Sequence, residues 1–302
     1  MRIALKKVVA SESWYSTRKA FIMSNYRYSQ LQFIASGGFG MVYRAVDNWT
    51  KRTVAIKQLS NPTPELLDRF KRERDMLTIH RENPFVVNIL DSCLDVPQPY
   101  LVLEYSSLGS LQKYVATRRN WRRAAGWLLD IAYGLTLIHE RGDIIRDIKP
   151  SNLLRFNRPD GSELIKIADF GLGQRPDNPS GQMTTSVFGT EGYIDPVAKV
   201  TGHFKAASDI YSLGVTMREL LTGSRGLWNR IPGPHPFRAL VASMTDPRPD
   251  NRPNARQIHG ETRTILETPP VASVAESDSK GIGLLLAGAA VVLGACLLAN
   301  AE

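Results

Sequence analysis

The chain has 302 residues, 43% hydrophobic and 22% charged, a composition that is typical of a folded globular protein and excludes disorder along the whole chain. Lysine and arginine outnumber aspartate and glutamate by 38 to 29, but this excess is concentrated near the N-terminus, so no nucleic-acid partner is expected for the mildly basic remainder. Two cysteines, Cys93 and Cys296, are too few and too distant for a disulfide scaffold or a cysteine-built metal site, and they fit a reducing cytosolic setting.

Residues 1–26 form a basic extension ahead of the first strand pattern, and we expect this extension to be disordered. Its content of arginine, lysine and serine, with almost no acidic residue, also resembles a transit peptide. A start of the protein at Met23 is a third alternative.

A glycine-rich turn lies between two strand-like runs at 29–34 and 41–47. Gly37 and Gly40 are spaced so that a hairpin tip could bring backbone N–H groups close to phosphate oxygens, because no Cβ intervenes. Ala35 stands where a third glycine would be expected. Taken alone, the pattern also fits an ordinary turn.

The next strand, 53–57, is apolar and ends in Lys57, a cation that needs an anionic partner when buried. Phosphate is one candidate and a carboxylate on a nearby helix is another. The pattern at 64–78 predicts a helix on which Phe70, Glu73 and Leu77 share one face. A carboxylate is out of place on this otherwise apolar face unless it is paired, so we expect Glu73 to pair with Lys57.

Two later segments carry the strongest signals: DIIRDIKPSN at 143–152 and IADFG at 167–171. With the glycine-rich turn and the strand that ends in Lys57, they resemble the signature set of the eukaryotic-type serine/threonine protein kinase family, in the same order. The resemblance covers residues 27–267. It also includes LVLEY at 101–105, GTEGY at 189–193, SDIYSLG at 208–214 and the Arg252–Pro253 pair.

The resemblance implies a bilobal α+β protein kinase-like fold, with a small β-rich N-lobe and a larger helical C-lobe. It also implies ATP and Mg²⁺ as cofactors and the following site residues. Asp147 would accept the proton of the attacking hydroxyl, and Lys149 would lie beside the transferred phosphate. Asn152 and Asp169 would hold Mg²⁺. The nucleotide would be bound by Ala35, Ser36, Gly37, Gly38, Phe39, Gly40, Val42, Ala55, Lys57, Glu73, Leu103, Glu104, Ser106 and Leu154.

The substrate class follows from the same resemblance, since Lys149 and Thr190 stand as in serine/threonine kinases. We therefore expect a protein substrate with a serine or threonine acceptor. Arg146, which precedes Asp147, suggests activation by phosphorylation within 172–188, where Thr184, Thr185 and Ser186 are candidate sites.

Besides Ala35, three features depart from the family pattern. Ile145 replaces a histidine, and we expect it to keep the apolar packing against Phe170. Val197 replaces the glutamate that normally pairs with Arg252, so this arginine needs another acid, which the sequence does not name. The short stretch from Gly223 to Pro247 predicts a reduced substrate-docking helix in the C-lobe.

The C-terminal residues have a different composition. Residues 268–280 mix proline, serine and acidic residues, as in a flexible linker. Residues 281–300 carry no charge, and the 18 residues 282–299 would span roughly 27 Å as a helix, close to the ~30 Å of a bilayer core. We expect a single C-terminal transmembrane helix that anchors a cytoplasmic kinase domain and could also mediate self-association. A buried C-terminal helix is the alternative.

The sequence thus favours an active, membrane-anchored serine/threonine protein kinase. A membrane-tethered pseudokinase, which binds nucleotide or partners without turnover, is the main alternative. A kinase of small molecules on a related fold is the third.

Overall fold

The structure is a computed structural model that describes residues 27–37, 40–115, 120–175, 189–226 and 230–269. Chain contacts divide the protein into a compact unit, 1–268, and a second unit, 269–302. The predictions for residues 1–26 concern residues outside the described ranges.

The N-lobe is built on a five-stranded antiparallel sheet in the order β1-β2-β3-β5-β4. Its strands are β1 (Tyr28–Gly37), β2 (Gly40–Asp47), β3 (Thr53–Gln58), β4 (Ile89–Cys93) and β5 (Tyr100–Glu104). Buried and half-buried residues alternate along β2 and β3, because successive side chains of a strand point to opposite faces. One face packs into an apolar cluster around Ile56, and the other carries Val42, Ala55 and Lys57.

Helix α2 (Pro64–Ile79) packs beside this sheet and begins at the N-cap Thr63, whose side chain accepts a hydrogen bond from the Leu66 N–H. Its buried residues are Phe70, Glu73, Met76 and Leu77. The predicted helix and its mixed buried face are therefore confirmed. Leu77 and Met76 join the core of the C-lobe, so α2 connects the two lobes.

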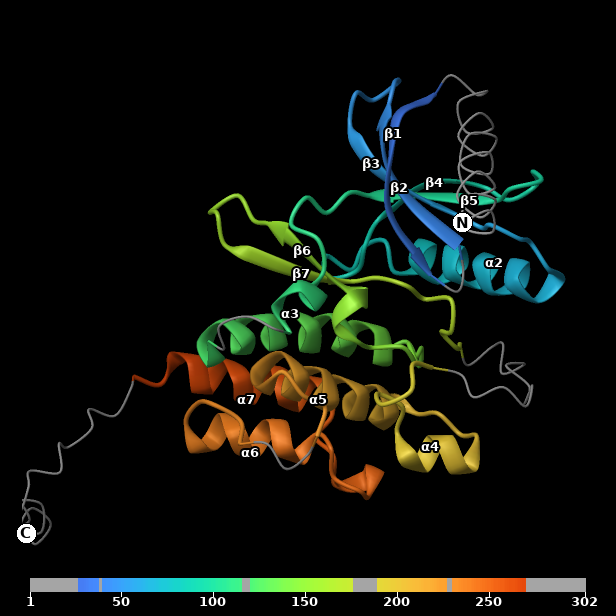
Figure 1. Cartoon of the computed structure of the whole chain (residues 1–302). Helices are drawn as coiled ribbons and strands as arrows, with labels where there is room; N and C mark the ends of the chain where they lie inside the picture. Colours follow the sequence, from blue (N-terminus) through green and yellow to red (C-terminus); the bar gives the residue numbers. More distant parts are fainter. Residues whose placement is uncertain (1–26, 38–39, 116–119, 176–188, 227–229, 270–302) are drawn as a thin grey trace, which may run out of the picture. The chain divides into compact units, whose positions relative to one another are not determined.

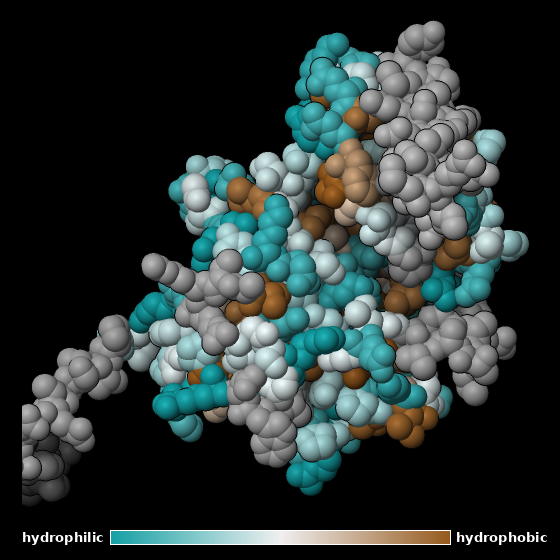
Figure 2. Space-filling model, viewed as in Figure 1, coloured by the Kyte–Doolittle hydropathy of each residue, from teal (hydrophilic) through white to brown (hydrophobic). Residues whose placement is uncertain are grey.

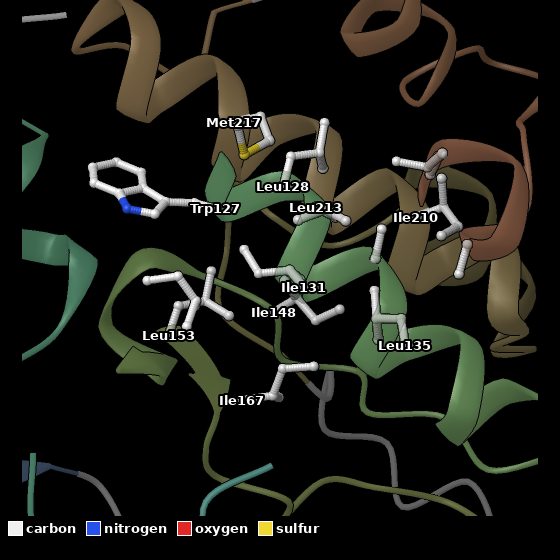
Figure 3. Packing of buried hydrophobic residues seen from close by; sticks show 14 of the residues in the cluster. Trp127, Leu128, Ile131, Leu135, Ile148, Leu153, Ile167, Ile210, Leu213 and Met217 are labelled. Atoms are coloured by element: carbon white, nitrogen blue, oxygen red, sulfur yellow. The ribbon is translucent and has the colours of Figure 1, made fainter. Parts of the chain in front are cut away.

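The C-lobe is largely helical (Figure 1). Its α-helices are α3 (Trp121–His139), α4 (Pro196–Thr201), α5 (Ala206–Thr222), α6 (His235–Ser243) and α7 (Ala255–Glu267). A hairpin of β6 (Leu153–Asn157) and β7 (Glu163–Ile167) and the short 3₁₀ turns η1 (Leu111–Tyr114), η2 (Pro150–Asn152) and η3 (Pro249–Asn251) complete the lobe. Figure 3 shows the core, where Leu128, Ile131 and Leu135 of α3 face Ile210, Leu213 and Met217 of α5.

The described residues between α5 and α6, 223–226 and 230–234, form no helix, and the sequence predicts a reduced helix in this region. Figure 2 shows a mostly hydrophilic face with apolar residues in separate small patches. The two-lobed kinase fold that the sequence predicts is confirmed.

The fold-class prediction is wrong in its last part, the transmembrane helix. Within the described ranges, no helix is both long enough and apolar enough to cross a membrane. The longest, α3, has 19 residues, but it carries Arg122, Arg123 and Asp130 and is buried against other helices instead of facing lipid. The predicted span, 281–300, lies outside the described residues. Membrane anchoring and self-association through that helix therefore have no support from the structure.

Candidate active site

A largely buried lysine joins three segments of the chain from the two lobes. The Lys57 Nζ of β3 lies 2.7 Å from both carboxylate oxygens of Glu73 in α2 and 3.1 Å from Asp169 Oδ1, just after β7. The predicted Lys57–Glu73 pair is confirmed. Asp169 as a second partner was not predicted, because no local pattern places residues 112 positions apart together.

Burial and charge act against each other in this cluster. Burial alone would lower the pKa of Lys57, but Asp169 and Glu73 outweigh it and raise this pKa, so the ammonium stays charged. Burial raises the pKa of Glu73, and the Asp169 carboxylate adds to the increase while Lys57 opposes it. The pKa of Asp169 is lowered despite its burial, chiefly by Lys57. The single Lys57 cation thus interacts with two carboxylates. An additional cation or a phosphate bound here would change the pKa values of these three groups.

A second polar cluster surrounds Asp147 in the C-lobe. Lys149 Nζ lies 2.7 Å from Asp147 Oδ2 and 2.6 Å from Thr190 Oγ1, and the Thr190 hydroxyl donates to Asp147 Oδ1 over 2.8 Å. The Asn152 amide donates to the same carboxylate over 3.0 Å and to the Asp147 carbonyl over 2.9 Å. These bonds orient the Asp147 carboxylate, which is 5% exposed.

Helix α5 fixes the backbone of this segment through Asp209. Its carboxylate accepts from the N–H groups of Ile145 and Arg146 over 2.9 and 2.8 Å, and it lies 3.0 Å from Nε2 of His139. Arg146 has φ +69°, a strained conformation for a non-glycine residue, which these bonds maintain. No role was predicted for Asp209, although its carboxylate stands in a largely apolar helix, where a charged side chain needs a partner.

The half-exposed face of the sheet lines the predicted adenine site. In the strand register, Val42 of β2 lies opposite Lys57 of β3, and Ala55 of β3 lies opposite Leu103 of β5. These four residues therefore lie together on neighbouring strands. Leu154, from β6 of the C-lobe, is also half-buried. The predicted residues Ala35, Ser36 and Gly37 are exposed at the end of β1, and Gly38 and Phe39 lie outside the described residues.

The two described glycines of the turn have different reasons for being glycine. A Cβ on Gly37 would meet nothing within 4 Å, which leaves open space beside the backbone. Gly40 has φ +140°, and a Cβ there would lie 2.0 Å from the Gln58 carbonyl oxygen. Packing against β3 therefore requires Gly40, whereas Gly37 leaves room for a ligand.

The segment after β5 is held by side-chain bonds. Glu104 accepts from Lys166 Nζ over 2.6 Å and from the Asn88 N–H over 2.8 Å, which ties β5 to β7. The Ser106 hydroxyl bonds the Gly109 N–H over 3.0 Å and also the Arg155 carbonyl. The side chains of Glu104 and Ser106, the two residues predicted to bind adenine through their backbone, are thus bonded to other parts of the chain.

Ile145, Phe170 and Leu77 lie in one buried cluster, as the sequence predicts for the replaced histidine. A different histidine, His80, stacks on Phe170 with ring centroids 6.0 Å apart, and its Nε2 lies 2.9 Å from Asp143 Oδ2. No role was predicted for His80 from the sequence. Burial lowers the pKa of His80, although Asp143 opposes this effect.

The acid that replaces the missing glutamate at Val197 is Asp195. Its two carboxylate oxygens accept from Arg252 over 2.8 and 2.9 Å, with both side chains almost completely buried. The same carboxylate caps α4 by accepting from the Val197 N–H and also accepts from Ser208. The departure at Val197 therefore does not leave Arg252 unpaired.

The predicted activation sites, Thr184, Thr185 and Ser186, lie outside the described residues. The arginine that would bind their phosphate, Arg146, stacks over the ring of Phe204 at 4.7 Å. Burial lowers the pKa of Arg146 to about 10, only partly offset by Asp209. An anionic partner would offset the desolvation of the buried Arg146 guanidinium.

Asn152 and Asp169 can supply oxygen ligands to a metal ion. The Asn152 amide nitrogen is committed to Asp147, which leaves its oxygen as the atom available to a cation. In the described part of the chain, no group of three or more His, Cys, Asp or Glu side chains could hold a metal. Asn152 and Asp169 together suit Mg²⁺, which commonly takes one or two protein ligands and completes its shell with phosphates and water.

Comparison with known proteins agrees with this geometry. A family model described as "Protein kinase domain" matches residues 28–262. The chain is 34% identical to the serine/threonine-protein kinase PBS1 of Arabidopsis thaliana over 70% of the chain and 47% of PBS1. It is 33% identical to the serine/threonine-protein kinase PBL27 of the same plant, over 75% of the chain and 45% of PBL27. The receptor-like kinase TMK2, also from this plant, is 32% identical over 68% of the chain and 24% of TMK2. The chain thus spans less than half of the length of these relatives.

Proposed function

The chain belongs to the eukaryotic-type serine/threonine protein kinase family, and from this premise we propose that it transfers the γ-phosphate of ATP to serine or threonine hydroxyls of protein substrates. The names of PBS1 and PBL27 support the serine/threonine class. Residues 27–267 would form the kinase domain.

The observation that carries this proposal is the assembled cluster of Lys57, Glu73 and Asp169. A lysine held by one buried and one partly buried carboxylate is positioned in advance to bind phosphate oxygens, and positioning with charge neutralisation is most of what phosphoryl transfer needs. Neutral side chains would stabilise a purely structural site at lower cost, because buried ions are expensive to desolvate.

On the acceptor side, we assign the proton-accepting role to Asp147. The acceptor hydroxyl would replace Thr190 or lie beside it at the Asp147 carboxylate, and its proton would pass to that carboxylate. Lys149, 2.7 Å from Asp147, would neutralise charge on the transferred group. Asn152 holds the carboxylate in place through its amide.

ATP and Mg²⁺ are the cofactors of this proposal. Mg²⁺, held by Asn152 and Asp169, would neutralise phosphate charge. The adenine ring would lie between Val42 and Ala55 on one side and Leu154 on the other, with Leu103 at the back of the site. The backbone of Glu104 and Ser106 would bind the ring edge, and residues 35–40 would cover the phosphates.

The test is transfer of labelled phosphate from ATP by the full chain with Mg²⁺, followed by phosphoamino-acid analysis. We expect phosphoserine or phosphothreonine, and we expect the label to disappear in the Asp147→Asn and Lys57→Met variants. A folded chain that binds ATP and transfers nothing would favour the pseudokinase scaffold instead.

A further inference from the structure

The segment that follows Thr190 lies next to the proposed acceptor site. Thr190 bonds both Asp147 and Lys149, and Gly192 is only two residues farther, within about 7 Å of chain. Burial and Glu219 raise the pKa of the Tyr193 hydroxyl, and the charges of Arg225 and Asp147 have smaller and opposite effects on this pKa. A peptide whose acceptor hydroxyl reaches Asp147 would therefore place neighbouring residues near Arg225.

Arg225 is fitted onto this segment from the connection that follows α5. Its Nη1 donates to the Glu191 carbonyl over 2.9 Å, and its guanidinium lies 5.3 Å from the centre of the Tyr193 ring. Gly192 has φ +90°, and a Cβ there would lie 2.4 Å from Arg225 Nη1. The close approach of Arg225 to the backbone thus requires a glycine at position 192.

The backbone around Arg225 is also held. The Ser224 N–H donates to Thr222 Oγ1 over 3.2 Å, and the Gly226 N–H donates to Ser224 Oγ over 3.1 Å. These two bonds restrict the backbone on both sides of Arg225, so less backbone entropy is lost when its guanidinium binds a ligand.

The charge of Arg225 remains available. The residue is exposed, and within the described ranges no carboxylate lies at ion-pair distance from its guanidinium. Two acids flank it: Glu219 accepts from the Tyr193 hydroxyl, and Glu191 is 3.7 Å from Lys199. With one N–H used by a backbone carbonyl, the planar guanidinium keeps donors that match a carboxylate.

We propose that Arg225 is a specificity-determining residue that binds an acidic side chain of the protein substrate close to the phosphorylated serine or threonine. The substrate class is thus narrowed to acceptor sites with an adjacent aspartate or glutamate. This inference rests on the proposed kinase function and assigns a sequence preference to it.

The test uses the full chain and short synthetic peptides with one serine and a single glutamate at each neighbouring position, each matched to a glutamine peptide. Binding is measured by fluorescence anisotropy, which needs no phosphate transfer, and transfer is measured separately. We expect one glutamate position to bind about two- to five-fold more tightly than its glutamine match, with the difference reduced by salt.

The variants separate recognition from folding. Arg225→Gln retains a donor for the Glu191 carbonyl, and we expect it to lose the preference, while Arg225→Glu should prefer lysine at the same position. Arg263→Gln, at an exposed arginine of α7, is the matched control and should keep the preference. Equal binding of every glutamate and glutamine pair, or a preference that survives Arg225→Gln, would overturn the inference. Absence of transfer with this binding pattern intact would count against the kinase function alone.

Discussion

The buried pair of Asp195 and Arg252 gives the sharpest prediction about stability. The side chain of Arg252 is 0% exposed and that of Asp195 is 2% exposed, and the two hydrogen bonds between them are 2.8 and 2.9 Å long. The Arg252 pair lowers the pKa of Asp195 although burial alone would raise it, so the carboxylate is charged near neutral pH. Asp195→Asn removes this charge and keeps a similar shape.

The expected cost follows from the burial of Arg252. Breaking a buried ion pair by removing one partner costs about 3–5 kcal/mol, because the remaining charge stays desolvated. Arg252 also donates to the carbonyls of Asp246 and Ala207, each over 2.9 Å, and these bonds persist in the variant. We therefore expect Asp195→Asn to lower the free energy of unfolding by about 3 kcal/mol, the lower end of the range.

A second substitution tests whether charge is the cause. Val197 and Asp195 line the same cavity of about 290 Å³, which leaves room for a longer side chain at position 197. The double variant Asp195→Asn with Val197→Glu should recover about half of the loss or more. Glu140→Gln is the control, because its partner Arg256 is exposed and the pair should contribute less than about 1 kcal/mol.

Urea denaturation of the full chain measures these differences, provided that the m-value stays constant among the variants. A loss of less than about 1 kcal/mol in Asp195→Asn would show that Arg252 is not left as an uncompensated buried charge. A double variant no more stable than the single one would refute the compensation between positions 195 and 197.

Three further predictions concern the site and its support. Glu73→Gln removes the charged partner of Lys57, so kcat/KM for ATP should fall by about ten- to a hundred-fold; an unchanged value would contradict the positioning role. Gly40→Ala should destabilise the chain in urea because of the clash with Gln58, whereas Gly37→Ala should not; equal effects would count against the packing explanation. Burial alone would raise the pKa of Glu163, but hydrogen bonds from Arg123, Arg155 and Trp127 lower it to about 2. The stability from this carboxylate is present above its ordinary pKa of 4.5 and is lost as the pH falls toward 2; a Glu163→Gln variant with the same acid slope would contradict this.

The sequence predicted those parts of the site that depend on local pattern. Glu73 was identified because a carboxylate stands out on an apolar helix face, and this argument needs only the helical period. The fold followed from ordered motifs, each of which occupies a few adjacent residues. The segment from 143 to 152 is an example.

The remaining parts depend on contacts between distant residues. Asp195 and Arg252 are 57 positions apart, and an aspartate before a proline looks like an ordinary helix cap. The role proposed for Arg225 depends on Gly192 and on the close approach of two connections, which no periodicity encodes. The transmembrane prediction came from composition alone, and composition does not show what surrounds an apolar segment.

We propose that Asp147 accepts the proton of the acceptor hydroxyl, and a single-turnover experiment isolates this step. The full chain and its Asp147→Asn variant are compared at saturating ATP and Mg²⁺, with nucleotide affinity measured in parallel. We predict equal nucleotide affinity within about two-fold and a transfer rate about 10²- to 10⁴-fold lower in the variant. A variant that binds nucleotide normally and transfers phosphate within about ten-fold of the unmodified chain would contradict the assignment of Asp147.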